Sequence, residues 1–133
     1  MRIRLPSGRY LHYLHPRIEP RKTPWGEMRM TVTYAGTDQN TRQWVRLSTH
    51  PGKWMENIIQ AIARDVLAAG LIEADRIGFD IIGHVHDEII ALTPDDSPLT
   101  VADLENAMCV HLPWAPDMPL KAEGWQGPYY KKD

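Results

Sequence analysis

Phe79-Asp-Ile-Ile-Gly-His-Val85 and Ile89-Ile-Ala-Leu-Thr93 are two apolar runs separated only by His86-Asp87-Glu88. Both runs are rich in β-branched residues, and their spacing predicts a β-hairpin with the three polar residues at its apex. A hairpin apex normally contains Gly or Asn, which supply the positive φ that a tight turn requires. An imidazole and two adjacent carboxylates occupy this apex instead. Such a conflict between a turn and its local chemistry indicates a functional position.

The apex residues Asp87 and Glu88 suit a hard divalent cation such as Mg²⁺, which prefers oxygen ligands and keeps several waters. An acidic surface turn without any ligand is the plainer alternative. Zinc is a second alternative, because His84 and His86 share one strand face at positions i and i+2. That pair lacks a convincing third and fourth ligand nearby in the sequence, and the loose candidates are Cys109 and His111.

A helix is predicted before the hairpin, from about Trp54 to Ala69. Its apolar face repeats every fourth residue, at Trp54, Ile58, Ile62 and Val66. Pro51-Gly52 breaks the chain before this helix, and Gly70 lies close to a C-terminal cap position. A second helix is predicted from Thr100 to about Val110. The tail from Leu112 to Asp133 contains four prolines, so we expect it to be extended or looped.

The first fifty residues are predicted to be β structure. The predicted strands are Arg2–Leu5 and Arg9–Leu14 around a Pro-Ser-Gly turn, then Met28–Tyr34 and Gln43–Thr49. A connection is expected over Ala35–Thr41, and Pro16–Pro24, with three prolines, is predicted to be a loop. The fold class is therefore α+β: N-terminal β-hairpins, a long helix, a hairpin with His-Asp-Glu at its tip, a second helix and an extended tail.

The composition is that of one ordinary domain. The chain has 133 residues, of which 43% are hydrophobic and 24% charged, enough to bury a single core. Its single cysteine, Cys109, excludes an internal disulfide. The N-terminus carries charge without an apolar secretion segment, and no run approaches the roughly 20 apolar residues of a membrane helix. We therefore expect a soluble cytoplasmic protein that does not interact with a membrane.

Charge is distributed unevenly along the chain. Residues 1–50 contain nine Lys/Arg and three Asp/Glu, a balance of +6, whereas residues 51–133 contain six and fourteen, a balance of −8. This asymmetry predicts a half that faces a polyanion beside an acidic or metal-binding half. Two solvated surfaces whose charges attract each other would produce the same pattern.

Several stretches resemble family A DNA polymerases, especially their phage-type branch. Val85-His86-Asp87-Glu88-Ile89 resembles the third sequence motif of that family, and residues 56–65 resemble the helix that precedes the motif. Further similar stretches are Leu5–Arg9, Trp114-Ala-Pro with Pro119-Leu120 and Ala122-Glu123, and Tyr130–Asp133. Thr49–Gly52 departs from the Tyr-Gly-Gly of phage relatives, which bears on the entry to the helix and on any role of Lys53.

The resemblance implies a role for each matched residue. Asp87 corresponds to one of two aspartates that hold the catalytic Mg²⁺ ions in the polymerase palm, and Glu88 to the adjacent helper carboxylate. His86 corresponds to a histidine near the primer terminus, and Gln60 to a glutamine that approaches the minor groove of the primer–template. Arg64 and Lys53 are further candidates for phosphate contacts. The same two cations have a plainer alternative, which is pairing with Glu56 and other nearby acids.

Two sequence motifs of such a polymerase are not found in the 133 residues. One is the earlier motif with the other metal-binding aspartate, and the second is the fingers helix whose Arg and Lys bind the incoming triphosphate. A two-metal site takes carboxylates from two strands, so we expect this chain alone not to polymerise DNA. The implied protein is the C-terminal part of the palm, a single partial domain over 1–133 with a basic β-rich segment (1–50) and a helix–hairpin–helix core (51–133). The implied partners are primer–template DNA, a deoxynucleoside triphosphate and an upstream polymerase chain.

Two other functions remain open at this point. One is a non-catalytic module that binds DNA or another partner, such as a prophage remnant, whose basic half contacts phosphates. The other is a stand-alone metal-dependent nuclease, which a single acidic cluster makes the weaker hypothesis. Without the rest of a palm sheet, the predicted hairpin of residues 79–93 has no neighbouring strands and exposes an unpaired edge. We therefore expect self-association or a partner chain.

Overall fold

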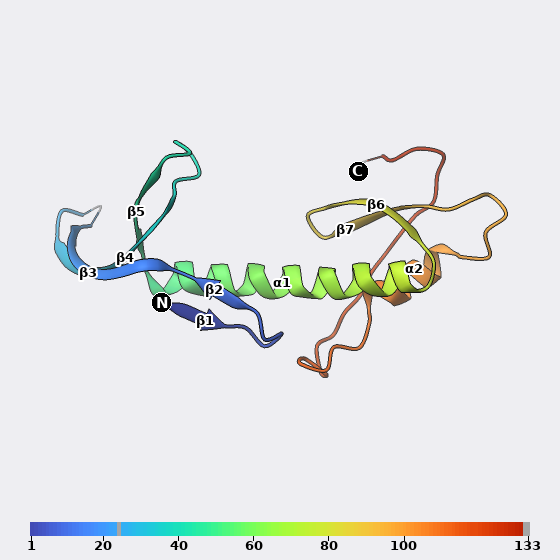
Figure 1. Cartoon of the computed structure of the whole chain (residues 1–133), viewed down its shortest axis with the longest axis horizontal. Helices are drawn as coiled ribbons and strands as arrows, with labels where there is room; N and C mark the ends of the chain where they lie inside the picture. Colours follow the sequence, from blue (N-terminus) through green and yellow to red (C-terminus); the bar gives the residue numbers. More distant parts are fainter. Residues whose placement is uncertain (24, 132–133) are drawn as a thin grey trace. The chain divides into compact units, whose positions relative to one another are not determined.

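The computed structural model describes residues 1–23 and 25–131. Its elements are, in chain order, β1 (Arg2–Arg4), β2 (Tyr10–His12), β3 (Leu14–Lys22), β4 (Met28–Thr37), β5 (Trp44–Thr49), α1 (Pro51–Arg76), β6 (Asp80–Val85), β7 (Glu88–Leu92) and α2 (Val101–Met108) (Figure 1). The strands form three antiparallel sheets, β1–β2, β3–β4–β5 and β6–β7. The α+β class is therefore confirmed. The chain divides into two compact units, Met1–Ala61 and Ile62–Asp133.

Aromatic contacts form the centre of the first unit. Tyr13 follows the β1–β2 hairpin and is buried, as is Leu5 in the loop of that hairpin. The ring of Tyr13 meets that of Tyr34 edge to face, with centroids 5.0 Å apart. Asn57 of α1 donates a hydrogen bond to the Tyr13 hydroxyl at 3.0 Å. This hydrogen bond satisfies the polar end of a buried ring.

The expected loop over Pro16–Pro24 is wrong, because residues 14–22 form strand β3. Within the described residues, β3 lies at the edge of its sheet and pairs only with β4. Proline is tolerated in an edge strand, since the hydrogen-bonding side that it lacks can face away from the sheet. The register also shifts between Leu14 and Arg17, next to His15 with its positive φ of 46°, which accommodates Pro16. Pro24 lies outside the described residues.

The other two strands of this sheet match the predicted ones, with one difference. β4 continues to Thr37, so the first three residues of the expected connection Ala35–Thr41 belong to a strand. The turn itself is organised by Asp38, whose carboxylate accepts hydrogen bonds from the backbone of Thr41 at 2.8 Å and of Asn40 at 3.0 Å. The hydrogen bonds from Thr41 lower the pKa of Asp38 below its usual value.

Helix α1 is longer at both ends than the predicted Trp54–Ala69. Pro51 and Gly52 begin the helix rather than interrupting the chain. Proline is favourable in the first turn, where its missing N–H would be unpaired in any case. His50 caps this end, since its Nδ1 accepts a hydrogen bond from the Lys53 backbone at 3.3 Å.

The expected cap at Gly70 is also wrong, because Gly70 is buried within α1. A Cβ at this position would lie 3.1 Å from the Cα of Met108, so the glycine permits close approach of the α2 backbone. The true C-terminal glycine is Gly78, with φ +107°. Its N–H bonds to Asp75 O and the N–H of Phe79 to Ala74 O, the pattern of a Schellman motif.

The second unit has a small core below its hairpin. Ala74 of α1, Phe79 and Ala107 of α2 are buried together, and partly buried apolar residues pack around them: Ile77, Ile81, Ala91, Leu99 and Leu104. Because Phe79 enters this core directly after the helix cap, the cap fixes where β6 begins. The hairpin that carries the candidate site therefore starts from the buried cluster of this unit.

Helix α2 confirms the second predicted helix, although it ends at Met108 rather than near Val110. Thr100 and Asp103 form a capping box, in which the Asp103 carboxylate accepts from the Thr100 backbone at 2.8 Å and from its hydroxyl at 2.7 Å. These hydrogen bonds lower the pKa of Asp103. Residues 109–131 contain neither helix nor strand, as expected for the proline-rich tail. No helix within 1–23 and 25–131 is long and apolar enough to cross a membrane.

Candidate functional site

The β6–β7 hairpin confirms the predicted strand–turn–strand element. Val85 pairs with Glu88, so the turn contains only His86 and Asp87, and Glu88 is the first residue of β7 rather than part of the apex. His86 has φ +52°, which a non-glycine residue adopts at a cost. A positive φ at the first turn residue is typical of a type II′ turn, where Gly is usual.

A bulge lies in the same hairpin. Ile81 pairs with Ala91 and Gly83 with Ile90, so Ile82 has no partner of its own across the strands. Ile82 is 56% exposed, whereas Ile81 packs against the core. Bulges bend a strand and redirect its side chains, and they are common near functional sites. The bulge therefore affects the direction in which the turn is presented.

The two carboxylates of the hairpin have different surroundings. Asp87 is exposed, and no hydrogen bond or ion pair from the described residues engages its side chain. Glu88 is held by the tail, because the hydroxyl of Tyr130 donates a hydrogen bond to its Oε2 at 2.9 Å. This hydrogen bond to Glu88 raises the pKa of Tyr130. Asp87 is thus available to a cation, whereas one oxygen of Glu88 already accepts a hydrogen bond.

Arg64 of α1 lies against His84 of β6. Its guanidinium nitrogens are 3.4 Å from Nδ1 and 3.3 Å from Nε2 of the imidazole. A guanidinium only donates, and a neutral imidazole has one accepting nitrogen, so at most one of these contacts is a hydrogen bond. The contact connects the helix to the hairpin. It also places a permanent cation beside His84, which disfavours a metal ion bound there.

The remaining predicted contacts lie on the part of α1 that belongs to the first unit. The ammonium of Lys53 pairs with the Glu56 carboxylate at 3.0 Å, which is the plainer alternative considered for this lysine. Gln60 is exposed, with Arg64 four residues further along the helix. Residues at this spacing share one face of a helix.

The donor set of the hairpin fits Mg²⁺ only in part. No group of three or more His, Cys, Asp or Glu side chains within residues 1–23 and 25–131 is arranged to hold a metal ion. Mg²⁺ is often bound through one or two carboxylates together with waters and substrate phosphates. The exposed Asp87 is a carboxylate of the kind that such a site uses, and a two-metal site would need further carboxylates.

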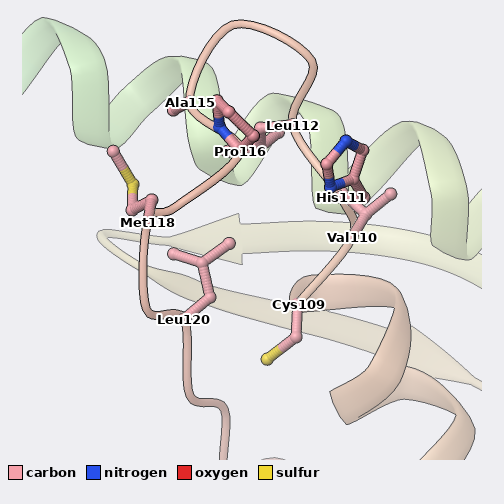
Figure 2. Close-up of a pocket in the computed structure, with 8 residues that line it drawn as sticks. All are labelled: Cys109, Val110, His111, Leu112, Ala115, Pro116, Met118 and Leu120. Carbon is pink, nitrogen blue, oxygen red and sulfur yellow. The ribbon is translucent and has the colours of Figure 1, made fainter.

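A cavity of about 250 Å³ lies beside the chain that follows α2 (Figure 2). Most of the residues that line it have apolar side chains, such as Leu112, Met118 and Leu120. Figure 2 shows the thiol of Cys109 and the imidazole of His111 pointing in different directions. The two side chains therefore do not form a pair of metal ligands.

Two side-chain contacts near the hairpin were not predicted from the sequence. His84 was considered only as a zinc ligand, although it contacts Arg64. Tyr130 belongs to one of the matched terminal stretches, but no spacing in the sequence relates it to Glu88, 42 residues earlier. Lys132 and Asp133, the rest of that stretch, lie outside the described residues.

The chain is similar to a protein described as a DNA polymerase from Bacillus phage SP02. The two are 39% identical over 131 residues, which is 98% of this chain but 19% of that protein. The chain thus spans about a fifth of the length of the curated relative that it matches. No protein-family profile matches the chain, and no solved structure resembles it. The similarity supports the expectation of a DNA polymerase segment and does not extend to family A in particular.

Proposed function

We propose that the chain is the C-terminal palm segment of a family A, phage-type DNA polymerase. In this proposal Asp87 is a metal-binding carboxylate for Mg²⁺-dependent nucleotidyl transfer, with Glu88 as its neighbour. The observation that carries the proposal is the similarity along 98% of the chain to a phage DNA polymerase. It is supported by the exposed Asp87 at the end of a two-residue turn.

The chemistry of nucleotidyl transfer explains why such a hairpin is useful. Mg²⁺ ions stabilise the attacking and leaving oxygens of the transferred phosphoryl group, so the protein must hold carboxylates where the substrate phosphates lie. A short hairpin fixed to a helical core presents Asp87 to solvent without a competing partner. The Tyr130 hydrogen bond restricts the orientation of Glu88. His86, Gln60, Arg64 and Lys53 are the proposed contacts to primer–template DNA.

The proposed site is incomplete in this chain. The second aspartate motif and the residues that bind the deoxynucleoside triphosphate would come from an upstream polymerase segment, so the chain alone is inactive. Both outer edges of the β6–β7 sheet lack a paired strand within the described residues. Ile82 and Leu92 are 56% and 57% exposed on these strands. Open edges with apolar side chains are consistent with a neighbouring chain or with self-association. The proposed compartment is the cytoplasm.

A chimera tests this proposal. The matching 131 residues of the phage SP02 polymerase are replaced by those of this chain, and primer extension is measured with Mg²⁺. We expect extension by the chimera and its loss, by about 100-fold or more, in Asp87→Asn. Asp96→Asn, which removes another exposed carboxylate from the loop after β7, is the matched control. Equal extension by the two variants would contradict the role of Asp87. An inactive chimera beside an active parent would contradict the equivalence of the two segments.

The non-catalytic alternative rests on the basic first half of the chain. A module of that kind would bind DNA in a salt-dependent way and would not support extension in the chimera. The same experiment therefore separates the two hypotheses.

A further inference from the structure

The two faces of the β3–β4–β5 sheet differ in chemistry. Alternate residues of each strand point to opposite faces, and the registers identify which residues share a face. One face has apolar side chains, of which Ile18, Met28 and Met30 are exposed. The other, here called the arginine face, consists of Arg17, Glu19 and Arg21 from β3, Arg29, Thr31 and Thr33 from β4, and Trp44, Arg46 and Ser48 from β5. None of these residues has a role in the proposed polymerase site.

One carboxylate on the arginine face, that of Glu19, forms ion pairs with three arginines. Glu19 lies 3.3 Å from Arg21, 3.9 Å from Arg46 and 4.0 Å from Arg17. Arg46 is the structural member of the group, since its guanidinium also donates to His15 O at 3.0 Å and to the Thr33 hydroxyl at 3.1 Å. One acid cannot neutralise three guanidinium groups. The face therefore keeps a surplus of positive charge, and Arg17 remains 66% exposed.

Two of the arginines lie directly opposite each other. Arg21 of β3 is the register partner of Arg29 of β4. Like charges at opposed positions of an antiparallel pair destabilise a sheet. Each of the two has a partner close in sequence: Arg21 pairs with the half-buried Glu19, and Arg29 pairs with the exposed Glu27. The Arg29 side chain is 71% exposed. A polyanion bound on this face would remove the repulsion.

Trp44 lies at the other end of the same face. It pairs with Thr37, eight residues along β4 from Arg29, which corresponds to about 26 Å of strand. Trp44 is 63% exposed, and no ring or cation contact engages it among the described residues. An exposed indole at the end of a row of arginines matches the composition of surfaces that bind single-stranded nucleic acid, where bases stack on aromatic rings and cations contact phosphates.

We propose that the arginine face binds single-stranded DNA, with phosphates on Arg17, Arg21 and Arg29 and a base stacked on Trp44. A planar guanidinium matches a phosphate in two hydrogen bonds at once, which favours phosphate over a diffuse anionic surface. Stacking on Trp44 requires an accessible base face, which duplex DNA does not offer. Glu19 competes with the phosphates for Arg17 and Arg21 and so limits the affinity.

Fluorescence anisotropy of the full chain with a labelled 20-nucleotide oligo-dT, without Mg²⁺, tests the proposal. Three phosphate contacts predict a slope of log K against log salt of about −2, which is about 15-fold weaker binding at 200 mM than at 50 mM salt. Arg17→Gln/Arg21→Gln/Arg29→Gln should abolish most of the slope. Trp44→Ala should weaken binding about tenfold and leave the slope unchanged. Glu19→Gln should tighten binding several-fold, an effect that loss of structure would not produce.

Matched controls make the outcomes distinguishable. Arg76→Gln removes an exposed arginine that pairs with Glu73 on α1, and it should leave binding unchanged. Asp87→Asn should also leave oligo-dT binding unchanged. The proposed role of Asp87 in the polymerase and the proposed binding by the arginine face can therefore fail independently. Binding unaffected by the triple variant, or unchanged or weakened by Glu19→Gln, would overturn the proposal. If the triple variant weakened binding of duplex DNA of the same length as much as binding of oligo-dT, the single-stranded assignment would be overturned. If it weakened binding of polyglutamate as much, DNA as the ligand would be overturned.

Discussion

Gly70→Ala tests the packing on which the hairpin depends. In an ordinary helix interior this change would stabilise the protein by about 1 kcal/mol, because glycine is the poorer helix former. Here the new Cβ would lie 3.1 Å from Met108 Cα and 3.6 Å from Ala107 O. Both are backbone atoms of α2, so relief requires the helix to move. Overpacking of this kind costs typically about 1–3 kcal/mol.

The expected net effect is a loss of about 1 kcal/mol in the free energy of unfolding, or about 4 °C in melting temperature for a chain of this size. Circular dichroism during urea and thermal denaturation measures it. Ala63→Gly is the control, since Ala63 is exposed on the same helix and its replacement should cost about 1 kcal/mol through propensity alone. If Gly70→Ala raised stability by about 1 kcal/mol, the close contact between α1 and α2 would be refuted.

Three further predictions concern the caps and the turn. His86→Gly should stabilise the chain by about 1 kcal/mol in denaturant unfolding, because glycine adopts the positive φ freely; destabilisation would contradict the turn geometry. Asp103 has a lowered pKa in the folded state, so its contribution to stability is present above about pH 3.9 and is lost as the pH falls through the folded value; thermal melts of Thr100→Ala should show less of this acid dependence. The raised pKa of Tyr130 should return towards that of an ordinary tyrosine in Glu88→Gln. Absorbance titration measures this change, with Tyr130→Phe as the reference that lacks the signal. A titration unchanged by Glu88→Gln would exclude the hydrogen bond.

Local patterns in the sequence were sufficient for most of the elements. The alternation and β-branching of residues 79–93 predicted β6 and β7, and the fourfold apolar spacing predicted the centre of α1. Errors arose where a residue with strong local preferences was accommodated by a neighbour distant in sequence. Pro16 and Pro20 lie in a strand because β3 is an edge with only β4 beside it. Gly70 lies inside a helix because α2 approaches it closely.

The sequence by itself determined the carboxylate-bearing hairpin and the segregation of charge between the halves, since both depend on residue type and short spacing. Tertiary structure alone decided that Tyr130 holds Glu88, that Arg64 lies against His84, and that four arginines from three strands share one face with Trp44. Side chains separated by tens of residues meet only when strand registers and helix ends are fixed. Those registers are set by the packing of the whole unit rather than by any short stretch of chain.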